Sequence, residues 1–146
     1  MKTGILLLII FPIFYFCQVS EENLIKATVG RLFDGMKTSD SVLINRSFSK
    51  TAILQTIDKA GGVKNEKISD FAVSISNAEK GSLDERITFS NILIDGNLAS
   101  VWTPYEFYYK GKFSHCGVNS FQLVKTDNEW KIQYIIDTRR KENCKK

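Results

Sequence analysis

The last third of the chain, from Leu98 to Arg140, has the strongest pattern in the sequence. It contains three long amphipathic runs, Leu98–Tyr109, Phe113–Lys125 and Trp130–Thr138, separated by short turn-forming segments. Such runs predict antiparallel strands joined by tight turns. A sheet with one apolar face needs other elements to cover that face, so the first half of the chain must supply them.

The first half of the chain predicts helices. Apolar residues recur at intervals of three and four from Glu21 to Met36, which is typical of an amphipathic helix. A second, shorter helix is expected to begin near Ser39 or Asp40, and a third is expected over Ile68–Ala78. These segments are the expected cover for the sheet.

Two further strands are expected, at Ala52–Ile57 and Ile87–Ile94, with a loop or loose hairpin from Gly61-Gly62 to Lys67 between them. Helices first and a strand meander last indicate the α+β class, with helices packed on one face of a curved antiparallel sheet. No linker or repeat divides this part of the chain, so one domain is expected over residues 18–146.

The N-terminus has the features of a secretory signal. Lys2 precedes an apolar run from Ile5 to Phe16, too short to cross a bilayer as a mature helix. We therefore expect residues 1–17 to be a signal peptide and the mature protein to be exported, periplasmic or secreted, with no stable membrane span after cleavage. A retained N-terminal anchor is the alternative.

Charge argues against nucleic-acid binding. The chain has a formal net charge of +4, and much of the basic excess lies in the terminal run Arg139–Lys146. A nucleic-acid-binding protein is expected to have a basic stripe on its folded surface, with aromatic residues interleaved. We interpret the terminal run as a solvated tail.

Two cysteines remain after the predicted cleavage, Cys116 and Cys144, and they either form one disulfide or stay free thiols. With His115 as the single histidine, a structural zinc site would be one ligand short. No phosphate loop or nucleotide motif is present, so the sequence predicts neither a metal nor a cofactor.

The turns predict which residues face one another. A two-residue loop at Asp127-Asn128 pairs Leu123 with Ile132 and Phe121 with Tyr134, and a three-residue loop at Lys110–Lys112 pairs Tyr109 with Phe113. One face then has an apolar centre and a polar rim. The predicted pocket residues are Tyr105, Phe107, His115, Phe121, Tyr134, Thr138 and Arg140.

The chemistry of this face depends on two residues. His115 titrates near neutral pH when unperturbed and is the candidate general acid or base, and a buried histidine that holds the bent sheet by hydrogen bonds is the slightly favoured alternative. Asp137 is its candidate catalytic partner, but the simple register places it on the opposite face, so a bulge is needed to bring the two together. Without a bulge, Asp137 would form a surface ion pair with Arg139 or Lys131.

The run from Ala99 through Trp102, His115, Gly117, Leu123, Trp130-Lys131-Ile132 and Asp137-Thr138-Arg139 resembles the nuclear transport factor 2-like superfamily. It is most similar to the branch of exported bacterial proteins described as putative lumazine-binding or SnoaL-like. The resemblance implies a cystatin-like cone, a bent sheet wrapped around helices with a pocket between them. The superfamily contains isomerases, dehydratases and cyclases as well as members that only bind, so the resemblance does not settle function.

We therefore expect an exported protein that binds a small apolar or aromatic molecule. One alternative is an isomerase- or dehydratase-type enzyme that uses His115 as general acid or base. Another alternative is a homodimeric interaction module that pairs through the outer face of the sheet.

Overall fold

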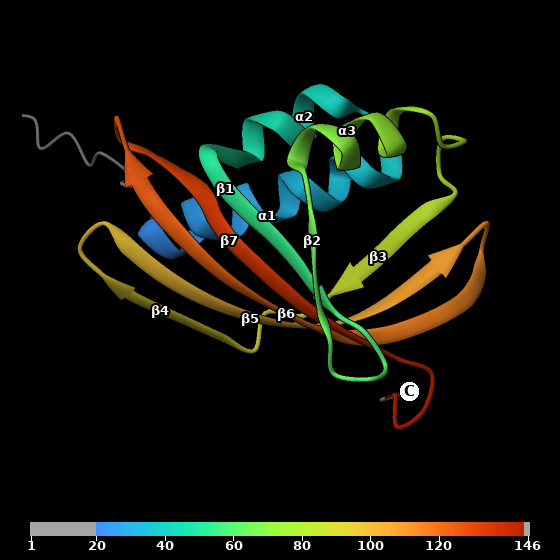
Figure 1. The fold of residues 1–146 in the computed structure, drawn as a ribbon. Helices are drawn as coiled ribbons and strands as arrows, with labels where there is room; N and C mark the ends of the chain where they lie inside the picture. Colours follow the sequence, from blue (N-terminus) through green and yellow to red (C-terminus); the bar gives the residue numbers. More distant parts are fainter. Residues whose placement is uncertain (1–19, 145–146) are drawn as a thin grey trace, which may run out of the picture.

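The computed structural model describes residues 20–144, and the predicted signal peptide at 1–17 lies outside this range (Figure 1). The described chain forms three helices and seven strands. In chain order they are α1 (Glu21–Thr38), α2 (Ser41–Ser47), β1 (Phe48–Ile57), β2 (Val63–Glu66), α3 (Ile68–Ser76), β3 (Leu83–Ile87), β4 (Asn91–Asp95), β5 (Leu98–Tyr109), β6 (Lys112–Thr126) and β7 (Glu129–Arg140).

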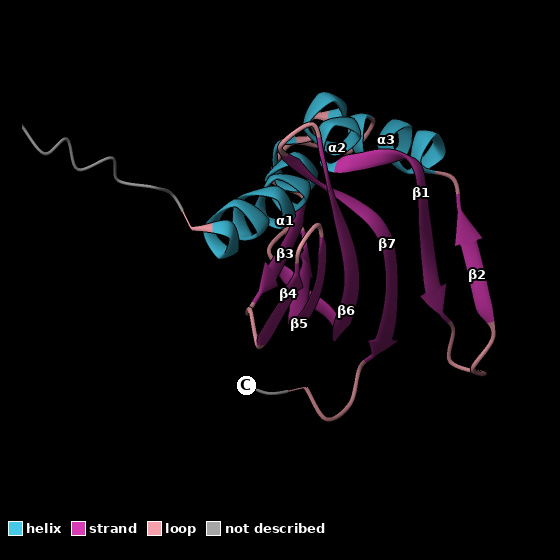
Figure 2. Ribbon diagram, turned by 90° about the vertical axis from the view of Figure 1, so that its left-hand side faces the viewer, coloured by secondary structure: helices cyan, strands magenta, loops and turns pink. Residues whose placement is uncertain are grey.

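One curved sheet contains all seven strands, and the helices lie together over one side of it (Figures 1 and 2). The strand order is β2-β1-β7-β6-β5-β3, and β4 pairs with the other half of β5. β1 runs parallel to β7 and every other pair is antiparallel, so the sheet is mixed. The predicted α+β class and the three predicted helices are confirmed.

Helix α1 supplies most of the cover for the sheet. Ser20 caps its N-terminus by accepting a hydrogen bond from the backbone N–H of Asn23, and Ser39 ends it in a left-handed conformation with φ of 56°. The buried side of α1 carries Ile25, Val29, Leu32, Phe33 and Met36, the stripe that the sequence predicts. None of the helices within residues 20–144 has the length and apolar character needed to cross a bilayer.

The core lies between α1 and the part of β6 and β7 that precedes and follows their shared turn. Phe121, Leu123 and Ile132 are completely buried there, and the ring of Phe33 meets that of Phe121 edge-on with centroids 6.2 Å apart. Burial of such side chains contributes about 1.5–3 kcal/mol each. This packing fixes β6 and β7 under the helix.

The predicted strand Ile87–Ile94 is wrong, because the chain forms β3 and β4 with a break between them. Ile87 pairs with Tyr105 and Asn91 with Trp102, so this edge has one more residue than β5 opposite it. The extra residue bulges the edge strand and turns the partly buried Phe89 onto the core.

The loop between β5 and β6 is shorter than predicted. Tyr109 pairs with Lys112, and the turn residues Lys110 and Gly111 have positive φ of 49° and 76°, as a tight primed turn requires. Ser114 then forms a bulge in β6, which restores the predicted pairs from Phe107 with His115 onward.

A second bulge, at Gln133 in β7, overturns the predicted register. Leu123 pairs with Ile132 as predicted, but Phe121 pairs with Ile135 and not with Tyr134. The side chain of Gln133 is anchored on β1, where its Oε1 accepts from Ser49 Oγ at 2.6 Å. Beyond this bulge every residue of β7 faces the side opposite to the predicted one.

Candidate functional site

A cavity of about 80 Å³ lies between the helices and the sheet. Its walls are apolar on the helix side and polar toward one end. The lining residues are Leu32, Phe33, Met36, Phe48, Leu54, Gln55, Thr56, Glu66, Phe71, Glu85, Asn119, Phe121, Ile135, Asp137 and Arg139. This combination of apolar walls and a few polar groups is typical of small-molecule sites.

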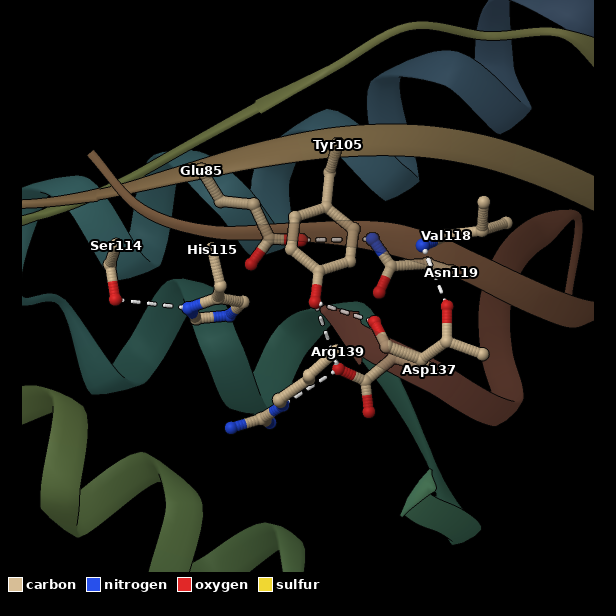
Figure 3. Close-up of polar contacts among 9 residues, drawn as sticks. Glu85, Tyr105, Ser114, His115, Val118, Asn119, Asp137 and Arg139 are labelled. Carbon is tan, nitrogen blue, oxygen red and sulfur yellow. Dashed lines mark hydrogen bonds and ion pairs between the residues drawn. The ribbon is translucent and has the colours of Figure 1, made fainter. Parts of the chain in front are cut away.

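Three strands bring the polar groups together. Glu85 comes from β3, Asn119 from β6, and Asp137 and Arg139 from β7 (Figure 3). Asp137 is opposite Asn119 only because the Gln133 bulge moves it to the inner face. The sequence analysis named a bulge as the condition for this placement, and the structure contains one.

Glu85 is the carboxyl group whose proton affinity rises most among residues 20–144. Glu85 is half-buried and borders the cavity, and partial loss of water raises the pKa of its carboxyl from 4.5 to about 7. Asn119 Nδ2 donates to Glu85 Oε1 at 2.9 Å, which opposes the rise, whereas the charge of Asp137 adds to it. Glu85 can therefore hold or release a proton near neutral pH.

Asp137 is buried and has one free acceptor. Its Oδ2 lies 2.9 Å from Arg139 Nε, but its Oδ1 has no hydrogen-bond partner among residues 20–144. The buried hydroxyl of Thr56, which pairs with Asp137 across β1 and β7, likewise has no partner in this part of the chain. Both residues line the cavity.

Tyr105 reaches Asp137 across a glycine. Its hydroxyl donates to the carbonyl oxygen of Thr138 at 2.8 Å and lies 3.3 Å from Asp137 Oδ2. Between them, Gly117 leaves the necessary space, since a Cβ there would lie 1.8 Å from the Thr138 oxygen and 2.6 Å from the Tyr105 ring. Burial and the nearby carboxylates raise the pKa of Tyr105, so this hydroxyl remains a hydrogen-bond donor.

His115 lies toward the open end of the same face. Its ring is 4.9 Å from that of Phe107 and 5.8 Å from that of Tyr105, and its Nδ1 is 3.1 Å from Ser114 Oγ (Figure 3). Burial lowers the pKa of His115, and the positive charge of Arg139 lowers it further. Within residues 20–144, the structure has no hydrogen bond between His115 and Asp137.

The predicted pocket residues separate into two groups. Phe121 lines the cavity, and Tyr105, Phe107 and His115 share its face of the sheet. Their roles stay predictions. The remaining three, Tyr134, Thr138 and Arg140, were predicted on this inner face, and the register shows this placement to be wrong.

These three residues make other contacts. Tyr134 donates to Gln55 Oε1 at 2.6 Å, and Thr138 Oγ1 accepts from the backbone N–H of Val118 at 3.2 Å. Arg140 is exposed at the end of β7. The cause is the extra residue Gln133, which exchanges the two faces.

Two residues of the site are absent from the sequence-based prediction. Glu85 lies in a segment to which the sequence analysis assigns no element, although the alternation of Leu83, Glu85 and Ile87 signals a strand with a carboxylate on its apolar side. Arg139 was assigned to the outer face. No local signal in the sequence reveals the bulge that turns it inward.

Cys116 and Cys144 form a disulfide, with their Cα atoms 5.8 Å apart. The bond fastens the end of the described chain to β6, close to the last pair of β7. The structure thus resolves the alternative between a disulfide and free thiols. Among residues 20–144, no group of three His, Cys, Asp or Glu side chains is arranged to hold a metal ion.

Comparison with solved structures shows the fold. A nuclear transport factor 2-like protein of unknown function from Shewanella baltica is 20% identical, with a TM-score of 0.67 over 82% of this chain and 94% of that one. A domain of unknown function with a cystatin-like fold from Nostoc punctiforme is 17% identical, with a TM-score of 0.67 over 82% and 77%. A similar protein from Methylobacillus flagellatus is 20% identical, with a TM-score of 0.65 over 84% and 96%.

No curated protein matches the chain. A family model described as "Putative lumazine-binding" matches residues 20–134, which is most of the folded domain. The chain therefore belongs to the putative lumazine-binding family, with the nuclear transport factor 2-like, cystatin-like fold.

Proposed function

We propose that this protein binds a small, mainly apolar or aromatic molecule in the cavity beneath its helices. The observation that carries the proposal is the free Oδ1 of Asp137, a buried acceptor at the polar end of an apolar cavity. Buried polar atoms are nearly always hydrogen-bonded, so an unused one points to a partner that the chain itself does not provide.

The cavity suggests how such a molecule would bind. Phe33, Phe71 and Phe121 offer apolar contact at one end, while Asp137 and Glu85 offer hydrogen bonds at the other. At about 80 Å³ the cavity is smaller than the 150 Å³ cavity that admits benzene in an engineered core. A ligand of lumazine's two-ring size therefore requires the cavity to widen.

The segment formed by β2 and α3 is the part of the wall best suited to move. All four residues of β2 are exposed, and only Ala72 and Ile75 of α3 are buried. Segments with little buried apolar surface open at low free-energy cost. Glu66 and Phe71 of this segment line the cavity, so its displacement would enlarge the binding space.

Export is part of the proposal. The apolar run after Lys2 supports a cleaved signal, and the disulfide between Cys116 and Cys144 supports an oxidising compartment, because such bonds rarely persist in the cytosol. The periplasm or the extracellular space meets both conditions. N-terminal sequencing of the protein from its own host would show a start near residue 18 if the signal is removed.

A second candidate function is an isomerase- or dehydratase-type enzyme. The specific observation in its favour is Glu85, whose pKa of about 7 suits a general acid or base. His115 is the alternative base, on the same face. Turnover lost in Glu85→Gln and kept in His115→Ala would identify the carboxylate, and the reverse would identify the histidine.

A third candidate is pairing of two copies through the outer face of the sheet. Trp102 is 47% exposed on β5, and Leu93 of β4 is 69% exposed near it. Contiguous exposed apolar side chains mark interaction surfaces. A dimer by light scattering that becomes a monomer in Trp102→Glu would support this pairing.

The binding proposal is tested by native mass spectrometry of the protein purified from its own host. We expect a retained small molecule in the wild type and its loss in Asp137→Asn, with Asp95→Asn at the exposed end of β4 as the matched control. Thermal unfolding of each variant separates ligand loss from misfolding. An empty wild type that also fails to bind small aromatic probes would contradict the proposal.

A further inference from the structure

A second hollow, of about 410 Å³, lies at the open end of the sheet next to the cavity. The end of β1, the turn before β2, His115 of β6 and the end of β7 form its walls. Thr56 and Arg139 line both the hollow and the cavity, so the two spaces adjoin.

The hollow is strongly basic. Its charged side chains are Lys59, Lys64, Arg139, Arg140, Lys141 and a single acid, Asp58.

The carboxylate of Asp58 already has hydrogen-bond and ion-pair partners within the chain. Asp58 Oδ1 accepts from the backbone N–H groups of Ala60 and Gly62 at 3.0 and 2.8 Å, and its Oδ2 lies 3.5 Å from Lys64 Nζ. Lys59, Arg140 and Lys141 form no ion pair within residues 20–144. The hollow thus contains three cations that have no ion-pair partner among the residues that the structure describes.

The positive charges around the hollow affect the pKa of His115. Arg139 and Lys141 both lower its pKa, in addition to the effect of burial, while Asp137 acts in the opposite direction. Tyr105 and Phe107 cover the ring from β5, and Ser114 contacts its Nδ1. A negative charge placed in the hollow would favour the protonated ring.

We propose that the basic hollow binds the carboxylate or phosphate group of a small organic anion whose apolar part enters the adjoining cavity past Thr56 and Arg139. Lysine and arginine recognise both groups by charge-assisted hydrogen bonds. This inference rests on the proposed binding function and specifies its ligand class. It also gives a role to the larger, charged space that shares Thr56 and Arg139 with a cavity too small for a whole ligand.

The test follows the ring protons of His115 by NMR in untagged protein, because this is the only histidine of the chain. The probes are benzoate, phenyl phosphate and the uncharged benzyl alcohol, and calorimetry gives each affinity. We expect at least one anion to raise the pKa of His115 and to shift the signals of Phe33 and Phe121. The tighter anion identifies the preferred acidic group.

Charge variants provide the matched comparison. Lys59→Gln/Lys141→Gln removes two cations from the hollow and is expected to weaken anion binding about fivefold, the effect of two partly screened charges. Lys50→Gln/Lys80→Gln removes the same charge from exposed residues elsewhere and should bind as the wild type does. Equal weakening in both double variants would reduce the effect to net charge and overturn the proposal.

The probes also separate this site from the cavity. Benzyl alcohol that shifts Phe33 and Phe121, with no anion affecting His115, would overturn the anion site and leave the binding cavity in place. An anion that raises the pKa of His115 without shifting either phenylalanine would support the hollow as an anion site and contradict the use of the cavity.

Discussion

The two ends of β6 and β7 differ sharply in what they place under the helices. Near their shared turn, Leu123 and Ile132 are completely buried in apolar packing. Beyond Gln133, the same two strands present Asn119, Asp137 and Arg139 to a cavity. The end near the turn contributes stability by apolar packing. The end beyond Gln133 has buried polar groups that a stable core would exclude.

The difference teaches that the open end is costly to the fold. A buried acceptor without a partner, such as Asp137 Oδ1, costs roughly 1–3 kcal/mol. A carboxyl such as Glu85, deprived of water, opposes folding once it is ionised. Sites that break the rules of core packing are expected to be functional.

The largest expected effect is at the apolar end. Leu123→Ala should lower the free energy of unfolding by about 4 kcal/mol, because it leaves a void in a fully packed region. Urea unfolding measures the loss. Leu98→Ala, at a half-exposed position on the same sheet, is the control, and a similar loss in both would show that the apolar end is not tightly packed.

Gly117→Ala should have the next largest effect and lower the free energy of unfolding by about 3 kcal/mol. The new methyl group would lie 1.8 Å from the Thr138 oxygen, so β6 and β7 would have to separate there. Gly30→Ala on α1, where nothing lies within 4 Å of the added atom, is the matched control and should not destabilise the protein. Wild-type stability in Gly117→Ala would contradict the close approach.

Glu85→Gln should make the protein more stable than the wild type at alkaline pH, by about 3 kcal/mol at pH 9. The folded pKa of about 7 is above the ordinary value of 4.5, so the wild type is stabilised by the bound proton at low pH and loses this contribution as pH rises through 7. The neutral glutamine does not undergo this loss. Stability difference curves between pH 5 and pH 9 check the sign.

The control for that curve is Glu22→Gln, at an exposed position of α1 where the ion pair with Lys26 is worth little. Its stability difference from the wild type should be small throughout. A flat curve for Glu85→Gln as well would mean that Glu85 is ionised and solvated in the folded protein.

Tyr105→Phe should have the smallest effect, a loss of about 1 kcal/mol. It removes the hydrogen bond to the Thr138 carbonyl while the ring still packs over Gly117. Thermal unfolding measures the change. Tyr109→Phe, at the exposed end of β5, is the matched control, and a larger loss there would show that the Tyr105 hydroxyl contributes little.

The sequence predicts the layers of this fold better than it predicts the site. The helix over Glu21–Thr38 follows from its apolar spacing, and the pairing of Leu123 with Ile132 follows from the turn. Local patterns of this kind survive because each is set by nearby residues. The site depends on which face Asp137 occupies, and that is decided at Gln133 by contacts with β1, distant in sequence.

Two errors near His115 cancel, which also shows the limit of local reasoning. The turn before β6 is one residue shorter than predicted, and the Ser114 bulge adds that residue back. The pair of Phe107 with His115 is therefore correct for a different reason. No such compensation occurs at Gln133, so Tyr134, Thr138 and Arg140 face away from the cavity beneath the helices.

The Gln133 bulge has a consequence for how such a pocket can change over generations. Loss of this one residue would restore simple pairing and turn Tyr134, Ile136 and Thr138 inward in place of Ile135, Asp137 and Arg139. A single deletion would thus exchange the chemical character of the pocket in one step, with no codon of the lining residues altered. The presence or absence of one residue at this point therefore decides which of the two faces of β7 lines the cavity.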